Sequence, residues 1–116
     1  MREKILEFFR KNPDSVSFVE LSRIDGFSGD QAWYLKNDKV SGILLWGGIS
    51  NEFLDAFDKL RADKIITMNS ASVLVYAIDG QMPALPVAKH ARHYKKEHWM
   101  PVVFSLDKIV LKAQIA

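Results

Sequence analysis

The sequence predicts a single domain of the α+β class. Its length of 116 residues is close to the commonest domain size. Residues 2–11 and 51–62 space their apolar side chains as helices do, and residues 65–78 contain two runs rich in β-branched side chains. The composition, 48% hydrophobic and 26% charged, is typical of a globular domain that buries one core.

The first predicted element is a helix over residues 2–11. Four apolar residues fall on one side of this helix, and charged residues occupy the remaining positions. The apolar residues are Ile5, Leu6, Phe8 and Phe9. The sequence NPD at 12–14 ends the helix, because proline cannot continue it.

Two capping boxes predict two short helices after it. In a capping box, the side chains of a serine and of a Glu or Gln three residues later satisfy each other's free amides. SFVE at 17–20 predicts a helix that reaches residue 24. SGDQ at 28–31 predicts a second helix, which contains WYL at 33–35 and ends before residue 37.

A buried strand and a longer helix are predicted next. GILLW at 42–46 is an apolar run between turn residues, which is typical of a buried strand. Ser50 suits a helix N-cap, and the helix should cover residues 51–62. Its buried stripe consists of Phe53, Leu54, Phe57 and Leu60.

Residues 65–78 give the clearest hairpin signal in the chain. Ile65 and Ile66 begin one β-rich run, NSA at 69–71 forms the turn, and VLVYAI at 73–78 returns.

The remainder of the chain is less regular. Pro83 and Pro86 disfavour regular structure over residues 81–88. Residues 88–98 could form a short helix or an irregular basic loop, and residues 101–104 are typical of a strand that covers the core.

The stretch SNEFLDAFDKLRADKIITMNSASVLVYAI at 50–78 resembles the recognition helix and wing of winged helix-turn-helix proteins. In that family a third helix passes directly into the first wing strand, as KLRADKI does at 59–65. The resemblance covers residues 1–80 as a winged-helix-like helical cluster with a β-hairpin wing. Residues 81–116 then form a basic C-terminal extension packed on the same core. The resemblance implies DNA binding through the major groove and the backbone.

The exposed face of the helix over 51–62 departs from that family's usual basic pattern. Its outward positions include Glu52, Asp55, Asp58 and Lys59. Carboxylates are repelled by the phosphates that line a DNA groove. No base-reading residue is therefore carried over from the family, and these four residues form a candidate surface for a protein partner.

Several classes of function are disfavoured by what the sequence lacks. The absence of cysteine excludes disulfides, thiolate metal sites and a cysteine nucleophile. No apolar run reaches the ~20 residues of a membrane span. MREKILEFFRKN at the start interleaves charged and apolar residues, unlike a signal peptide. We expect a cytoplasmic protein with no membrane contact, similar in size to small proteins of phages and mobile elements.

Positive charge is concentrated in the C-terminal part of the chain. Residues 1–80 hold ten Lys/Arg and twelve Asp/Glu, a net charge of −2, whereas residues 81–116 hold six and two, a net charge of +4. The densest cluster lies in VAKHARHYKKEHWMPVVF at 87–104 and contains Lys89, Arg92, Lys95 and Lys96. Such a cluster favours contacts with phosphates, and it is also compatible with an ordinary solvated face.

Aromatic and histidine side chains are interleaved with these cations. Tyr94 could stack on bases or anchor the segment, whereas Trp99 is expected in the core. His90 and His93 could share one helix face, but His98 falls off it, and no HExxH or glycine-rich phosphate motif is present. We therefore expect no metal, no cofactor and no enzymatic activity.

The function predicted from these observations is DNA binding in transcription regulation or as an accessory of replication. Lys89, Arg92, Lys95 and Lys96 would contact phosphates, with Tyr94 beside them, and a homodimer would double these contacts. The alternative is a protein-interaction module that uses the acidic helix over residues 51–62. Double-stranded and single-stranded nucleic acid are both left open.

Overall fold

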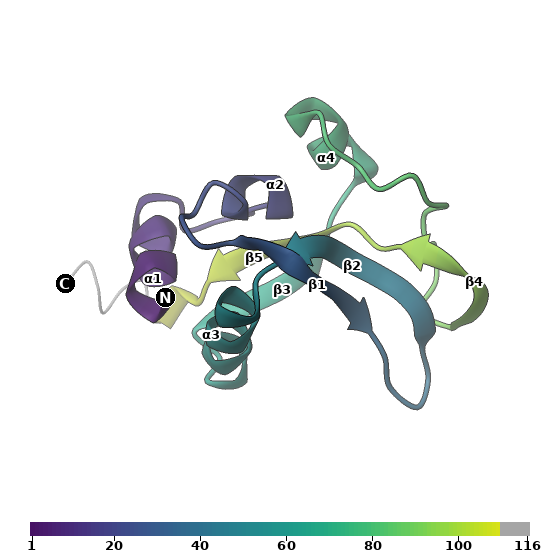
Figure 1. Cartoon of the computed structure of the whole chain (residues 1–116), viewed down its shortest axis with the longest axis horizontal. Helices are drawn as coiled ribbons and strands as arrows, with labels where there is room; N and C mark the ends of the chain where they lie inside the picture. The colour runs from purple at the N-terminus through teal and green to yellow at the C-terminus, as the bar shows by residue number, and fades with distance from the viewer. Residues whose placement is uncertain (110–116) are drawn as a thin grey trace.

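The computed structural model describes residues 1–109, and Figure 1 shows how their helices and strands are arranged. The helices are α1 (Arg2–Lys11), α2 (Phe18–Leu21), α3 (Asn51–Ala62) and α4 (Val73–Asp79). The strands are β1 (Ser28–Leu35), β2 (Ser41–Ile49), β3 (Ile66–Ser70), β4 (His93–Trp99) and β5 (Val102–Leu106). The α+β class predicted from the sequence is confirmed.

Two small sheets carry the fold. In the first sheet, β2 is central and pairs antiparallel with β1 and parallel with β4. In the second sheet, β3 and β5 are antiparallel, from the pair of Ile66 with Leu106 to the pair of Ser70 with Val102. The chain beyond residue 80 thus contributes one strand to each sheet.

Helices α1 and α3 form where the sequence predicts them. The Ser50 hydroxyl caps α3 by accepting a hydrogen bond from the Phe53 amide at 3.1 Å. Both helices are amphipathic, and Phe9 of α1 meets Phe57 of α3 with ring centroids 6.4 Å apart. Figure 1 shows the two helices at the same end of the molecule.

The core is dominated by aromatic rings. Phe18 of α2 stacks on Trp46 at 5.6 Å and meets Phe104 edge-on at 5.1 Å. The fully buried Tyr76 of α4 donates its hydroxyl proton to the Val102 carbonyl at 2.6 Å and accepts a hydrogen bond from the Phe18 amide at 3.1 Å. These bonds fix α2, α4 and β5 to one another, and burial raises the pKa of Tyr76 to about 12.

The capping box at residues 28–31 does not start a helix, so the prediction of a helix there was wrong. The segment is β1, in which exposed and partly buried residues alternate with the period of a strand. Trp33 pairs with Trp46 of β2 and packs on the core. Gly29 lies so close to β2 that an added Cβ would sit 2.8 Å from the carbonyl oxygen of Ile49. Pairing with β2 therefore overrides the local capping signal.

The hairpin over residues 65–78 was also predicted wrongly. Its first half is β3, but its second half is helix α4. The Ser72 hydroxyl caps this helix by accepting from the Leu74 amide at 3.2 Å, and Gly80 ends it in the left-handed conformation at φ 82°. These two end signals prevail over the β propensity of VLVYAI. The partner of β3 is instead β5.

The order of elements around α3 consequently differs from the expected wing. A hairpin, β1 with β2, precedes α3, and β3 follows it and pairs with a strand from the C-terminal part of the chain. Residues 93–99, predicted as helix or loop, are strand β4. Among residues 1–109, no helix has the length and apolar character needed to cross a membrane.

Candidate nucleic-acid interface

The cations at residues 89–96, which we call the basic segment, follow the chain past the turn between β1 and β2, at the right of Figure 1. A small cluster of Val40, Ile43 and Ala88 packs there, separate from the main core. His93 at the start of β4 adds two hydrogen bonds, from Nδ1 to the Ser41 hydroxyl at 2.9 Å and from Nε2 to the Asp38 carbonyl at 3.0 Å. The carbonyl can only accept, so Nε2 carries a proton and both ring nitrogens are satisfied.

Six cationic side chains gather at this end of the molecule, which we call the basic end. They are Lys36, Lys39, Lys89, Arg92, Lys95 and Lys96, and all six are exposed. The acidic residues beside them are Asp38 and Glu97, so the basic end carries +4, whereas the other ten Lys/Arg and twelve Asp/Glu of the chain carry −2. Within the part of the chain that the structure describes, none of the six forms an ion pair.

Glu97 is bound to another strand and not to these cations. Its carboxylate accepts a hydrogen bond from the Tyr34 hydroxyl at 2.8 Å, across β2. This hydrogen bond raises the pKa of Tyr34. The bond ties β4 to β1 and leaves Lys95 and Lys96 free to meet an external anion.

Arg92, Tyr94 and His98 form a stack along β4. The Arg92 guanidinium lies 4.4 Å from the centre of the Tyr94 ring, and the His98 ring lies 3.9 Å from it. Two groups this close to one ring centre must occupy opposite faces. Tyr94 therefore has no free face on which a base could stack, and its hydroxyl donates to the His90 carbonyl at 2.8 Å. In this structure the Tyr94 ring supports the Arg92 side chain.

A bulge in β4 presents the two adjacent lysines. Ser41 pairs with His93, and Ile43 pairs with His98. A step of two residues along β2 therefore corresponds to a step of five residues along β4, so β4 contains extra, bulged residues. Gly42 permits this bulge, because its φ is +69° and an added Cβ would lie 2.5 Å from the Tyr94 carbonyl oxygen. Lys95 and Lys96 are both exposed within the bulge.

The acidic surface predicted on α3 lies away from the basic end. Glu52, Asp55, Asp58 and Lys59 are all exposed, and Figure 1 places α3 at the other end of the molecule from β4. The acidic helix therefore does not cover the basic segment.

The expectations for the other aromatic and histidine residues have different outcomes. Trp99 is 1% exposed, which confirms that it belongs to the core. Trp33 and Trp46 are partly buried against the same core. In the described part of the chain, no three His, Cys, Asp or Glu side chains are grouped so that they could hold a metal ion.

Sequence reasoning missed Lys36 and Lys39. The wrong helix over residues 28–36 hid the turn that carries these lysines. Recognising that WYLKNDKVSGILLW is a hairpin around the turn residues KNDK would have placed them beside a strand end. Their proximity to β4 depends on the parallel pairing of β2 with β4, for which the sequence has no local signal.

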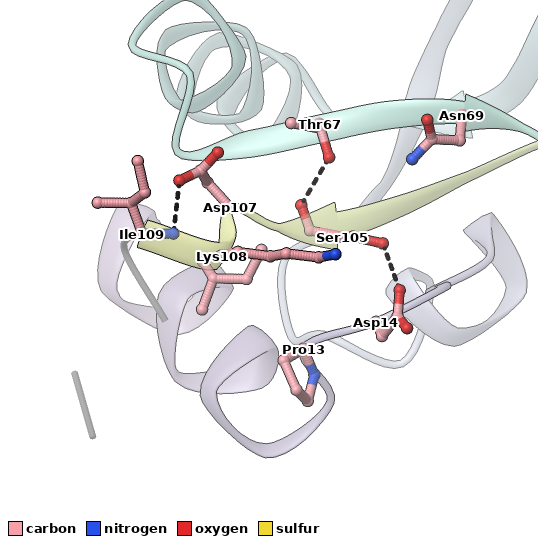
Figure 2. Close-up of a pocket in the computed structure, with 9 residues that line it drawn as sticks. Pro13, Asp14, Thr67, Asn69, Ser105, Asp107, Lys108 and Ile109 are labelled. Carbon is pink, nitrogen blue, oxygen red and sulfur yellow. Dashed lines mark hydrogen bonds between the residues drawn. The ribbon is translucent and has the colours of Figure 1, made fainter. Parts of the chain in front are cut away.

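A second candidate site is a pocket of about 560 Å³, lined by polar and apolar residues, beside the β3–β5 sheet (Figure 2). The Ser105 hydroxyl donates to the Asp14 carboxylate at 2.8 Å and accepts from the Ser15 amide at 3.1 Å. These bonds hold Ser15 at a φ of 54°. The Ser105–Asp14 pair thus secures the residue 13–16 segment to β5.

Comparison of the chain with protein-family models, with curated proteins and with solved structures found no match. The case for a function therefore depends on the geometry of the basic end.

Proposed function

We propose that this protein binds nucleic acid, with DNA as the expected form, through contacts between its basic end and the phosphate backbone. The observation that supports the proposal is the gathering of six exposed, unpaired cations from two distant segments of the chain onto one end, against a net negative remainder. Such a charge distribution attracts a polyanion and orients it toward that end. A role in regulation or as a replication accessory would follow from this binding.

The individual residues suit different kinds of contact with the phosphate backbone. Arg92 is oriented by the Tyr94 ring, so its planar fork is prepared for two parallel hydrogen bonds to one phosphate. Lys95 and Lys96 on the bulge, and Lys36 and Lys39 on the turn, are mobile point charges that accommodate backbones of different shape. Contacts of this kind position a backbone without reading sequence.

The salt dependence of binding tests the proposal. We expect labelled duplex and single-stranded DNA to bind at ~50 mM salt and, if all six cations make contact, to lose about 10³-fold in affinity at ~200 mM. A Lys89/Arg92/Lys95/Lys96→Ala variant should lower the slope of log affinity against log salt by about four for duplex DNA. Fluorescence anisotropy measures both quantities.

Two further variants make this test specific. Lys36/Lys39→Ala should lower the slope by about two, because these lysines also belong to the basic end. A matched control, Lys11/Arg23/Lys59/Lys108→Ala, removes three lysines and one arginine outside the basic end and should leave the slope nearly unchanged. Absence of binding at low salt, or equal losses in the control, would refute the proposal.

A protein-interaction role for α3 remains the second candidate. It is supported by the exposure of Glu52, Asp55 and Asp58, none of which forms an ion pair among residues 1–109. A basic partner protein would fit this face. A protein captured from a cell extract by the wild type, and lost with an E52Q/D55N/D58N variant, would support this role.

A further inference from the structure

The Tyr94 ring is the place in the basic segment where a base of a single strand would be expected to stack. Tyr94 is the one Phe, Trp or Tyr among residues 89–96, and cations lie on both sides of it in the sequence. Proteins that bind single strands commonly combine such cations with aromatic rings on which successive bases stack. Whether a face of this ring is free therefore bears on which form of nucleic acid the basic end binds.

His98 covers one face of the Tyr94 ring. The two ring centroids are 3.9 Å apart, and the ring planes are inclined by 29°. Nδ1 of His98 lies 2.8 Å from the Lys96 carbonyl oxygen, and it donates the hydrogen bond because a carbonyl can only accept. The His98 side chain is half-buried. The stack and the hydrogen bond together hold this imidazole over the tyrosine ring.

Arg92 covers the other face. Its guanidinium carbon lies 4.4 Å from the centre of the Tyr94 ring. A guanidinium that stacks on a ring keeps its N–H groups available for a phosphate. The Tyr94 hydroxyl donates to the His90 carbonyl at 2.8 Å, which fixes the ring between its two neighbours. One face of Tyr94 thus orients a phosphate ligand, and the other face is closed by His98.

The second aromatic ring near these cations is Tyr34 of β1. Among residues 1–109 it is the one Phe, Trp or Tyr side chain classed as exposed, at 41%. Its hydroxyl donates to the Glu97 carboxylate at 2.8 Å. A negative charge at the rim of the ring repels the phosphates of a strand that would stack there. Tyr34 is therefore a poor place for a base despite its exposure.

We propose that the basic end binds double-stranded DNA in preference to single strands, and that His98 sets this preference by covering the face of Tyr94 on which a base would stack. This inference rests on the proposed function and specifies its ligand. A surface that contacts only phosphates gains most from the form with the higher charge density, and duplex DNA carries one charge per about 1.7 Å of axis against about 3.4 Å for one strand. Stacking would offset that difference, and His98 prevents it.

The first experiment compares three labelled probes of equal length by fluorescence anisotropy at ~50 mM salt. The probes are a random duplex, a single strand of oligo-dT and an abasic single strand, which keeps the phosphates and lacks the bases. The wild type should bind the duplex about tenfold more tightly than oligo-dT. It should bind oligo-dT and the abasic strand within about twofold of each other, because the bases add no contact.

Removal of the cover should create single-strand binding. His98→Ala exposes one face of Tyr94, so affinity for oligo-dT should rise about fivefold, the lower end of the gain from one stacked base. Affinity for the duplex and the abasic strand should stay nearly unchanged, because all six cations remain. His98→Leu keeps the face covered and should retain the wild-type ratios. Circular dichroism of each variant shows that the fold is retained.

His90→Ala is the matched control for His98→Ala. It removes an imidazole from the same basic segment, but the contacts of His90 with Tyr94 come from its backbone. The ratio of oligo-dT to abasic affinity should therefore stay as in the wild type. A rise in this ratio equal to that of His98→Ala would overturn the assignment of the cover to His98.

Three further results would overturn the inference while leaving the proposed function intact. The first is a wild type that binds oligo-dT as tightly as the duplex, or clearly more tightly than the abasic strand. The second is a His98→Ala variant that binds oligo-dT no better than the wild type; a loss would make His98 itself a stacking platform. The third is a selective loss of oligo-dT affinity in Tyr34→Leu. Absence of binding to all three probes would instead refute the proposed function, and this inference with it.

Discussion

The acidic face of helix α3 and the basic end lie at opposite ends of the molecule, and they are held in different ways. Helix α3 presents its carboxylates from a backbone fixed by fully buried residues, among them Phe57 and Leu60. The basic end is held by side-chain hydrogen bonds of His93 and Tyr94, a ring stack and a cluster of three buried residues. Stability should therefore respond mainly to changes at the first end, and binding mainly to changes at the second.

The largest expected effect is on the buried side of α3. Phe57 touches Phe9, Phe53, Trp33 and Phe104. Phe57→Ala should lower the free energy of unfolding by about 3–5 kcal/mol, since it removes a large buried ring and leaves a cavity. Urea denaturation measures the loss. Asp58→Ala, at the exposed neighbouring position, should change stability by less than ~0.5 kcal/mol; a similar loss for both variants would contradict the burial of Phe57.

A smaller loss is expected from removal of one buried hydroxyl. Tyr76→Phe leaves the Phe18 amide and the Val102 carbonyl without their shared partner, at a cost of about 2–4 kcal/mol. Chemical denaturation at pH 7 gives this value. A loss below ~0.5 kcal/mol would mean that the two backbone groups find other partners.

The same residue makes stability depend on alkaline pH. Burial raises the pKa of Tyr76 to about 12, whereas an unfolded tyrosine has a pKa near 10. The folded state therefore retains the phenolic proton to higher pH. The contribution is fully present below pH ~10 and is lost as pH rises towards about 12. Unfolding between pH 9 and 12 should show this decline in the wild type and a flatter profile in Tyr76→Phe.

The next prediction concerns the backbone of the basic end and uses the substitution Gly42→Ala. The left-handed φ and the approach to the Tyr94 carbonyl both oppose a side chain, so we expect a loss of about 2 kcal/mol and weaker DNA binding by the folded protein. Gly47→Ala on the same strand is the matched control, since its Cβ enters open space and stability should change by less than ~0.5 kcal/mol. Equal effects of the two substitutions would show that the bulge does not depend on Gly42.

The parts of the fold that the sequence predicts correctly are those fixed by local chemistry. Ser17 and Ser50 cap α2 and α3 as expected, and each hydroxyl accepts from the amide three residues later. Ser28 begins an equally good capping box, yet its segment is β1, because β2 lies alongside and the Trp33 ring packs on the core. A local signal identifies a helix end only where no strand partner competes for the same residues.

The candidate site could likewise be predicted only where its residues are neighbours in the sequence. Lys89, Arg92, Lys95 and Lys96 lie within eight residues of one another, so the sequence alone groups them. Lys36 and Lys39 join them only through the pairing of two distant strands, and the stack on both faces of Tyr94 depends on the β4 backbone. Long-range pairing, and not composition, decides which cations belong to the basic end.

The smallest effect concerns the histidines and should alter binding while leaving stability unchanged. His90 is exposed between Lys89 and Arg92, and its backbone groups, not its ring, contact Tyr94. His90→Glu places a negative charge between these two cations, so DNA affinity should fall severalfold at ~50 mM salt. His90→Gln keeps the backbone contacts and adds no negative charge, so it should bind DNA more tightly than His90→Glu. Anisotropy titrations measure the difference, and Asn12→Glu, which adds the same charge at the distant end of α1, is the control. Equal losses of affinity in His90→Glu and Asn12→Glu would exclude His90 from the interface.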